Sequence, residues 1–348
     1  MITIGIVGGM VTFFFQGKKS IEPSVTLSFS HEPFLENFFR HPLSGEKLEA
    51  SRENPFVFAV MVENSAEAWP LSGLEKAFLV IEAPVEAGIP RFIAFYSEET
   101  EVEKIGPVRS ARLYYLDWAG EFGALYAHVG GSPEALQEIR SRNLFDLNEF
   151  YHAPIFWRSS DRYAPHNTYT SSSLLNDFLL TQQKQDIVSE SVYELWNFKE
   201  DEPVVRTPES PLEIQTRFSF SDLYDVSWHY ESKTNKYRRF QAGKEAGILA
   251  HETSLLANNV VFLMTDIRSI DEVGRKAIRT LGEGDAIILQ DGKMIEGYWN
   301  KSSADARLRF YDDKNNEIKW NAGKTWIEIV SSQEDLSILF EEEDSTSE

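Results

Sequence analysis

Short apolar runs alternate with amphipathic segments between residues 56 and about 185. Helices are predicted after Ser72, whose spacing to Glu75 matches a capping box, and after Ser110 and Ser132, which are favoured N-cap residues. Strands that alternate with helices predict an α/β domain with a mostly parallel or mixed sheet. The runs that predict its buried strands are FVFAVMVEN (56–64), AFLVIEA (77–83), RFIAFYSE (91–98) and ALYAHVGG (124–131).

From residue 212 onward the segments are short, rich in aromatic and β-branched residues, and separated by turns, which is typical of β-strands. Asp291-Gly292 predicts a two-residue hairpin turn, and one helix is expected near 271–281. The predicted fold class is therefore α+β / α/β: an N-terminal α/β domain with a mixed sheet, followed by a mostly antiparallel β domain, either a barrel or a sandwich.

Proline-rich and charged stretches separate these regions. The predicted organisation is a membrane anchor or signal-like segment (1–17), a linker (18–50), the α/β domain (51–190), a second linker (191–211), the β-rich domain (212–332) and an acidic tail (333–348).

The first seventeen residues carry no charged side chain, and Lys18 and Lys19 follow them. The run is slightly shorter than the roughly 20 residues that usually span a bilayer. We expect an N-terminal membrane anchor with the bulk of the chain extracytoplasmic, although the lysine pair alone favours the opposite orientation. An uncleaved signal segment and a buried strand–helix piece are the alternatives; the latter would make this an intracellular interaction protein.

Composition excludes several classes of function. Lys and Arg total 34 against 55 Asp and Glu, which gives a net charge of −21 and argues against direct binding of nucleic acid or of anionic lipid surfaces. The absence of cysteine excludes disulfides, thiolate zinc sites and a cysteine nucleophile. Histidine spacing matches no metal-binding motif, so neither a metal nor another cofactor is predicted.

Arg109 and Arg112 are the first candidate site residues. Both flank Ser110 at the predicted start of a helix, where the helix dipole disfavours cations. Negative charge is therefore expected beside them, either from Glu82 and Glu86 or from an anionic ligand that arginine grips with two parallel hydrogen bonds. Internal pairing and ligand binding are both compatible with the pattern.

Two carboxylates, Glu82 and Glu86, follow a predicted strand and precede Arg91. Paired carboxylates can divide acid and base roles when their environments differ. The alternative is that they pair with the arginines and hold loops together.

His128, Gly130, Gly131 and Ser132 end a strand and begin a helix, a geometry that can direct backbone N–H groups at an anion. The glycines can equally serve a tight turn, and Ser132 is a cap more readily than a nucleophile. His166, Asn167 and Tyr169 lie in an irregular segment of the kind that carries site residues. His166 is a catalytic candidate together with His128, and Asn167 and Tyr169 are candidate ligand-binding residues.

The stretches 58–96, 104–136 and 164–171, together with VSWHYE, KYRRFQAGK, DGKMIEGYW and TWIEIV, resemble the YerB-like putative lipoprotein family of Gram-positive bacteria. The resemblance covers about residues 42–330 and implies a membrane-tethered extracytoplasmic protein with two distinct domains and no established activity. The lipobox cysteine of some members is missing, so anchoring here would be by peptide. Trp69-Pro70 replaces the more usual Arg-Pro.

Three hypotheses follow. The first is a cell-envelope protein that binds an anionic group of a wall polymer or an envelope protein, through one polar cleft at the strand ends. The second is a cell-wall glycan-active enzyme using Glu82 and Glu86, with His128 and His166 as further catalytic candidates. The third is the intracellular interaction protein. Whether any reaction is catalysed stays open.

Overall fold

The computed structural model describes residues 39–340 except 186–192, 204–210, 212 and 246–253. The chain divides into two units, 1–37 and 38–348, and the first lies outside the described residues, as do the predicted anchor and the last eight residues of the acidic tail. In the described part of the chain, no helix has the length and apolarity needed to cross a membrane.

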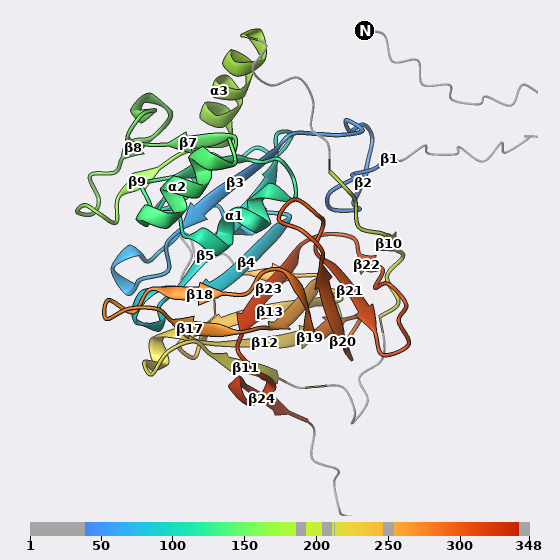
Figure 1. The fold of residues 1–348 in the computed structure, drawn as a ribbon. Coiled ribbons are helices and arrows are strands. Elements are labelled where there is room, and N and C mark those ends of the chain that lie inside the picture. The colour runs from blue at the N-terminus through green and yellow to red at the C-terminus, as the bar shows by residue number, and fades with distance from the viewer. Residues whose placement is uncertain (1–38, 186–192, 204–210, 212, 246–253, 341–348) are drawn as a thin grey trace, which may run out of the picture. The chain divides into compact units, whose positions relative to one another are not determined.

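A ten-stranded mixed sheet forms the centre of the second unit (Figure 1). Its order is β21-β20-β19-β16-β23-β4-β5-β3-β6-β7. The strands are β3 (Val57–Val62), β4 (Leu79–Pro84), β5 (Pro90–Ser97), β6 (Leu125–His128), β7 (Asp146–Asn148), β16 (Asn259–Met264), β19 (Gly282–Gln290), β20 (Lys293–Lys301), β21 (Arg309–Asp312) and β23 (Thr325–Val330).

A second, antiparallel sheet of six strands has the order β14-β13-β12-β11-β24, with β15 paired to β13. It covers part of one face of the central sheet. These strands are β11 (Glu213–Arg217), β12 (Asp225–Glu231), β13 (Lys236–Gln241), β14 (Lys244–Glu245), β15 (Leu256–Ala257) and β24 (Leu336–Leu339).

Alternation along the strands divides the core into two layers, because successive side chains in a strand point to opposite faces. On β3, Phe58 and Val60 pack in the layer with the second sheet and α3 (Ser172–Lys184), whereas Ala59 and Met61 pack in the layer with α1 (Leu113–Gly120) and α2 (Pro133–Ser141). Both faces of the central strands are therefore buried, which explains their continuous apolar runs.

Four two-stranded pairs complete the described fold: β1 (Phe39–Arg40) with β2 (Lys47–Leu48), β8 (Trp157–Arg158) with β9 (Thr168–Tyr169), β10 (Phe198–Lys199) with β22 (Trp320–Asn321), and β17 (Ile267–Ser269) with β18 (Lys276–Ile278).

The predicted α+β class is confirmed, with a large mixed sheet and antiparallel strands. The hairpin at Asp291-Gly292 joins β19 to β20, and both turn residues have positive φ. The helix expected over 271–281 is wrong, because β17 and β18 form a hairpin there. Ser72 caps no helix; Gly73 precedes the short 3-10 turn Leu74–Lys76.

The central sheet runs through both predicted domains. β23, from the C-terminal half, pairs in parallel with β4, from the N-terminal half, with Trp326 opposite Val80. The two halves therefore share the central sheet and contribute to both core layers, and the predicted linker over 191–211 does not coincide with a break in that sheet.

Candidate functional site

An extended segment carries Arg109 and Arg112. The prediction that Ser110 begins a helix is wrong, since α1 begins at Leu113 with Arg112 at its N-cap position. The reason is that backbone groups in the segment are bonded to neighbouring strands and turns: the Arg109 amide donates to Met61, and the Ala111 amide donates to Gly130. Residues 109 and 112 therefore do not share a helical face, and their side chains reach different partners.

Arg112 forms a two-pronged ion pair with Glu86, with both hydrogen bonds 2.7 Å long. Glu86 lies in the short 3-10 turn η3 (Glu86–Gly88), which connects β4 to β5. Burial would raise the pKa of Glu86, but hydrogen bonding to Arg112 and the charge of that guanidinium outweigh burial and lower the pKa below its ordinary value. Glu86 is thus an ionised counter-charge.

Arg109 reaches a separate group of side chains at the end of β3. Its Nε lies 3.1 Å from Glu63, whose carboxylate also lies 3.0 Å from Nδ1 of His166 and accepts a hydrogen bond from Ser65 at 2.8 Å. Glu63 is buried. Its carboxylate is the common partner of the Arg109 guanidinium, the His166 imidazole and the Ser65 hydroxyl. The arrangement anchors the loop that contains His166 to the sheet.

Arg91 lies in β5 on the face that packs against α1, and its Nη1 donates to the Ser110 carbonyl at 2.7 Å. It is only 7% exposed, and within the described ranges it makes no ion pair. Burial, with help from the charges of Arg112 and Arg109, lowers the pKa of Arg91 to about 10. We call Arg91, Arg109 and Arg112 the arginine cluster.

Tyr126, on β6, belongs to the same layer as α1 and is buried. Its hydroxyl has no hydrogen-bond partner in the described structure. Burial raises the pKa of Tyr126, and the charges of Arg91 and Arg112 act in the opposite direction. Sequence reasoning missed Tyr126, because a tyrosine in an apolar strand is usual core material.

His128 is fully buried, and both of its ring nitrogens are engaged. Nε2 lies 2.6 Å from Asp146, and Nδ1 lies 2.6 Å from the Gly130 carbonyl. Gly130 has φ 58° and turns the chain toward α2, while Gly131 forms a bridge with Ala111. The imidazole therefore holds a turn in place and is not available as a base in this arrangement.

Ser132 is the N-cap of α2, as predicted: its hydroxyl accepts a hydrogen bond from the Ala135 amide at 3.3 Å. A hollow of about 380 Å³ lies beside Ser132 and Arg112, between the starts of α1 and α2 and the β17–β18 hairpin. Arg275 of that hairpin contacts Glu134. Both candidate residues, Ser132 and Arg112, line this hollow.

Glu82 lies on the opposite face of the sheet from Arg91 and is fully buried. Its carboxylate accepts hydrogen bonds from Arg239 at 2.7 Å and from Asn64 at 3.2 Å. Glu328, its register partner on β23, is also fully buried. The expected pairing of Glu82 with Arg91, Arg109 or Arg112 is thus not what the structure shows.

Asn167 and Tyr169 belong to the β8–β9 hairpin: Asn167 directly precedes β9, and Tyr169 lies in it. Asn167 donates to the Ser159 carbonyl and accepts from Arg158, at 3.1 and 3.2 Å. Tyr169 is buried, and the Lys104 ammonium lies 4.2 Å from its ring centre. Neither side chain makes a described hydrogen bond to the arginine cluster, whereas Glu63 and Ser65, which sequence reasoning missed, directly adjoin it. The feature of the sequence that could have indicated Glu63 and Ser65 is the group of polar residues at the end of an apolar strand.

Comparison with known proteins places this geometry in a family. The N-terminal domain of the protein of unknown function DUF3048 matches residues 43–186, and its C-terminal domain matches residues 214–327. The chain is 29% identical over 299 residues to "Putative lipoprotein YerB" of Bacillus subtilis (strain 168), covering 85% of this chain and 88% of the relative.

A crystal structure of the YerB protein from Bacillus subtilis has the same fold. It matches with a TM-score of 0.74 and 27% identity, over 86% of this chain and 99% of that one. The resemblance indicated by the sequence motifs is confirmed: this chain belongs to the DUF3048 family of proteins of unknown function.

Proposed function

We propose that this chain is a cell-envelope protein, held at the membrane by its N-terminal segment and displayed outside, that binds an anionic group through the arginine cluster. The ligand would be a carboxylate or phosphate of a wall-associated polymer or envelope protein. The relative's name, which describes a lipoprotein, and the uncharged first seventeen residues support the location. The printed sequence has no cysteine, so the peptide segment itself is the candidate tether.

The observation that carries the binding proposal is the state of Arg91. Arg109 and Arg112 are each matched by a carboxylate, Glu63 and Glu86, whereas Arg91 has only the Ser110 carbonyl as its hydrogen-bond partner in the described part of the chain. Burial of a charge is costly unless another charge or several hydrogen bonds compensate for it. An anionic ligand would provide that compensation.

The Tyr126 hydroxyl supports the same conclusion. A buried donor without a partner costs about 1–3 kcal/mol. An anion bound beside Arg91 would be a candidate acceptor for this hydroxyl, which has no described partner. One ligand would therefore compensate both for the buried charge of Arg91 and for the Tyr126 hydroxyl that lacks a partner.

The glycan-hydrolysing alternative receives less support. Glu82 has no exposed surface and is held by Arg239, and Glu86 is ionised and held by Arg112. A retaining or inverting mechanism needs two carboxyl groups that both reach the substrate. Glu82 and Glu86 are held by different arginines, and Glu82 is inaccessible to a substrate.

Binding of soluble poly(glycerol phosphate) and poly-glutamate to the full chain tests the proposal and distinguishes phosphate from carboxylate ligands. We expect Arg91→Gln to weaken binding at least tenfold. Arg140→Gln removes the same charge from an exposed position on α2 and should leave binding unchanged. Equal affinity of the Arg91→Gln and wild-type proteins would overturn the proposal.

Tyr126→Phe provides a second variant that keeps the ring and should fold normally. It should weaken binding several-fold without lowering the melting temperature, because the hydroxyl has no partner to lose. Protease accessibility on intact cells tests the location separately: digestion of the displayed unit is expected outside, and full protection would contradict that orientation.

A further inference from the structure

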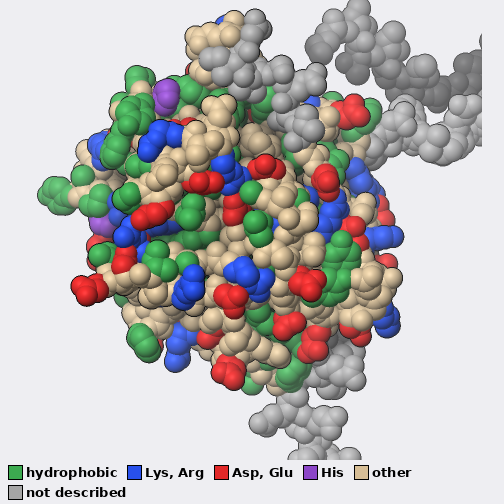
Figure 2. Space-filling view, viewed as in Figure 1, with side chains coloured by type: hydrophobic (Ala, Val, Ile, Leu, Met, Phe, Trp, Pro, Cys, Tyr) green, Lys and Arg blue, Asp and Glu red, His purple; other side chains and the backbone are tan. Residues whose placement is uncertain are grey.

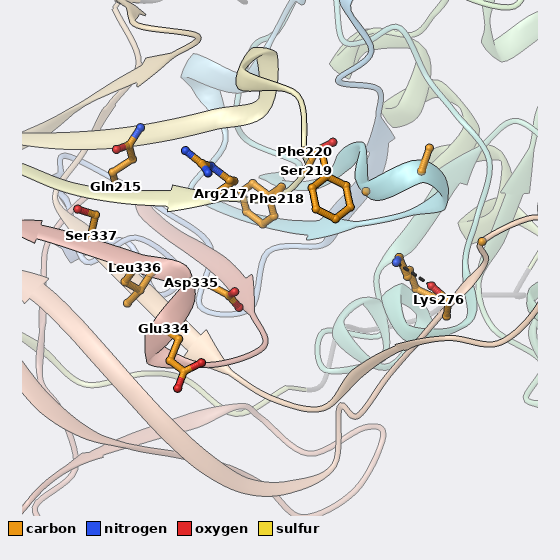
Figure 3. A pocket seen from close by; sticks show the side chains of 14 residues that line it. Gln215, Arg217, Phe218, Ser219, Phe220, Lys276, Glu334, Asp335, Leu336 and Ser337 are labelled. Carbon is orange, nitrogen blue, oxygen red and sulfur yellow. Dashed lines mark hydrogen bonds between the residues drawn. The ribbon is translucent and has the colours of Figure 1, made fainter.

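A hollow of about 780 Å³ opens between the end of β11, the start of β24 and the β17–β18 hairpin (Figure 3). A second hollow of about 650 Å³ lies along β11 and shares Gln215 and Arg217 with the first. We call the two together the β11 groove. The two hollows adjoin at these shared residues.

Aromatic rings line one wall of the β11 groove. Phe220 is fully exposed, and Phe218 is half-buried against the core. Figure 3 shows both rings on the same side of the hollow, across from Lys276. An exposed phenylalanine contributes nothing to the core, so the exposed ring is available to stack on a ligand.

Apart from two leucines and several alanines and glycines, the remaining lining is polar or charged, and it is not basic. Gln215, Ser219 and Ser337 present amide and hydroxyl groups, which can both donate and accept hydrogen bonds. The charged groups lining the two hollows are two cations and four acids: Arg217, Lys276, Glu334, Asp335, Asp222 and Asp225.

Those charges exclude a polyanion as the best occupant. Arg217 lies 3.3 Å from Asp225 and is already paired, which leaves Lys276 as the cation without a carboxylate among the described contacts of the groove. Polyanions bind where several cations are concentrated on one face. Figure 2 shows the same mixture on the face in view, with basic and acidic side chains interspersed.

We propose that the β11 groove binds a neutral, hydroxyl-rich glycan chain. Stacking of sugar rings on Phe220 and Phe218, and hydrogen bonds from ring hydroxyls to Gln215 and the serines, match the two kinds of lining. The two adjoining hollows give room for more than one sugar ring. No member of the arginine cluster lines the groove, although Ala87 and Gly88, from the turn that carries Glu86, border its first hollow.

Calorimetric titration of the full chain with the hexamer of β-1,4-linked N-acetylglucosamine, and with cellohexaose, tests the inference. Wild-type protein should bind at least one of them. Phe220→Ala should weaken binding at least tenfold, and Gln215→Ala should weaken it several-fold. Tyr163→Ala removes an equally exposed ring outside the groove and should have no effect.

Three results would overturn the inference: no binding of either hexamer, an unchanged affinity in Phe220→Ala, or binding of an extended Val-Thr peptide in place of both glycans. The peptide result would point to strand addition at β24, the terminal strand of its sheet. Arg91→Gln should leave glycan affinity unchanged, so failure here and failure of anion binding are distinguishable.

Discussion

The Arg239 guanidinium donates to Glu82 at 2.7 Å in the core, and both side chains have almost no exposed surface. Arg239 comes from the second sheet and Glu82 from the central sheet, so the ion pair joins the two layers. Glu328 lies beside them, 3.9 Å from Arg239, and accepts a hydrogen bond from Trp228 at 2.9 Å. One buried cation is thus shared by two carboxylates.

Arg239→Leu should destabilise the protein by about 3–5 kcal/mol, because it leaves both carboxylates buried without their cation. Urea unfolding measures the change. Arg238→Leu is the matched control: the neighbouring arginine pairs with Glu231 and Glu245 near the surface, so its loss should cost about 1 kcal/mol or less. Similar costs for the two variants would contradict a special role for Arg239.

Glu328 should make stability fall as pH rises. Burial, followed by the negative charge of Glu82, raises the pKa of Glu328 well above its ordinary value of 4.5. A carboxyl whose pKa is raised on folding binds its proton more tightly in the folded state, so its contribution is complete below pH 4.5 and is lost as pH rises toward the folded pKa.

Glu328→Gln resembles the protonated form and should remove the contribution of Glu328, while Glu82, whose pKa is also raised by burial, keeps its own pH dependence. The free energy of unfolding of the wild type, minus that of the variant, should decrease between pH 4.5 and pH 8, with a limiting slope of about 1.4 kcal/mol per pH unit. A difference that stays constant over this range would show that folding does not raise the pKa of Glu328.

The apolar runs were sufficient to predict most of the central strands, since their side chains are buried on both faces whatever the strand order. They were not sufficient to predict that β23 pairs with β4, because register and neighbours depend on contacts between residues about 246 positions apart, as for Thr325 and Leu79. The predicted division into an α/β domain and a following β-rich domain was based on chain order alone.

The candidate site was predicted in part. Arg112 and Glu86 do meet, as a pattern of opposite charges on adjoining loops suggested. Glu82 was placed wrongly because its position on β4 turns it toward the second sheet, where Arg239 supplies the charge. A glutamate inside an apolar strand, as at Glu328 in TWIEIV, is the signal that could have indicated a buried partner.

Glu86→Gln should strengthen anion binding several-fold. The Glu86 carboxylate occupies two donors of Arg112, so its neutral analogue would compete less with an incoming anion. Affinity for poly(glycerol phosphate) measures the effect. Glu194→Gln, which removes a carboxylate paired with Arg309 away from the cluster, is the control; weaker binding by Glu86→Gln would argue that Glu86 orients Arg112 for the ligand.

Ser132→Ala should destabilise the protein by about 1 kcal/mol, since it removes the side chain that caps α2. Ser110→Ala should change the free energy of unfolding by less than about 0.5 kcal/mol, because Ser110 engages Arg91 through its backbone carbonyl, which alanine retains. Chemical unfolding of the two variants side by side checks both values. A larger loss at Ser110 would contradict the assigned start of α1.

Gly130 and Gly123 have similar positive φ values, 58° and 53°, but different surroundings. A Cβ added at Gly130 would lie 2.9 Å from the Phe150 ring, whereas a Cβ at Gly123 would meet nothing within 4 Å. Gly123→Ala should therefore cost only the roughly 1–2 kcal/mol of a left-handed backbone, and Gly130→Ala should cost measurably more in urea unfolding.

The double variant Gly130→Ala/Phe150→Ala separates the two contributions. Phe150 is 66% exposed, so its truncation alone should have a small effect, and in the double variant it should reduce the penalty at Gly130 to that of Gly123→Ala. If the double variant is as unstable as Gly130→Ala, the clash is not with Phe150, and the turn that joins His128 to α2 is constrained by its backbone alone.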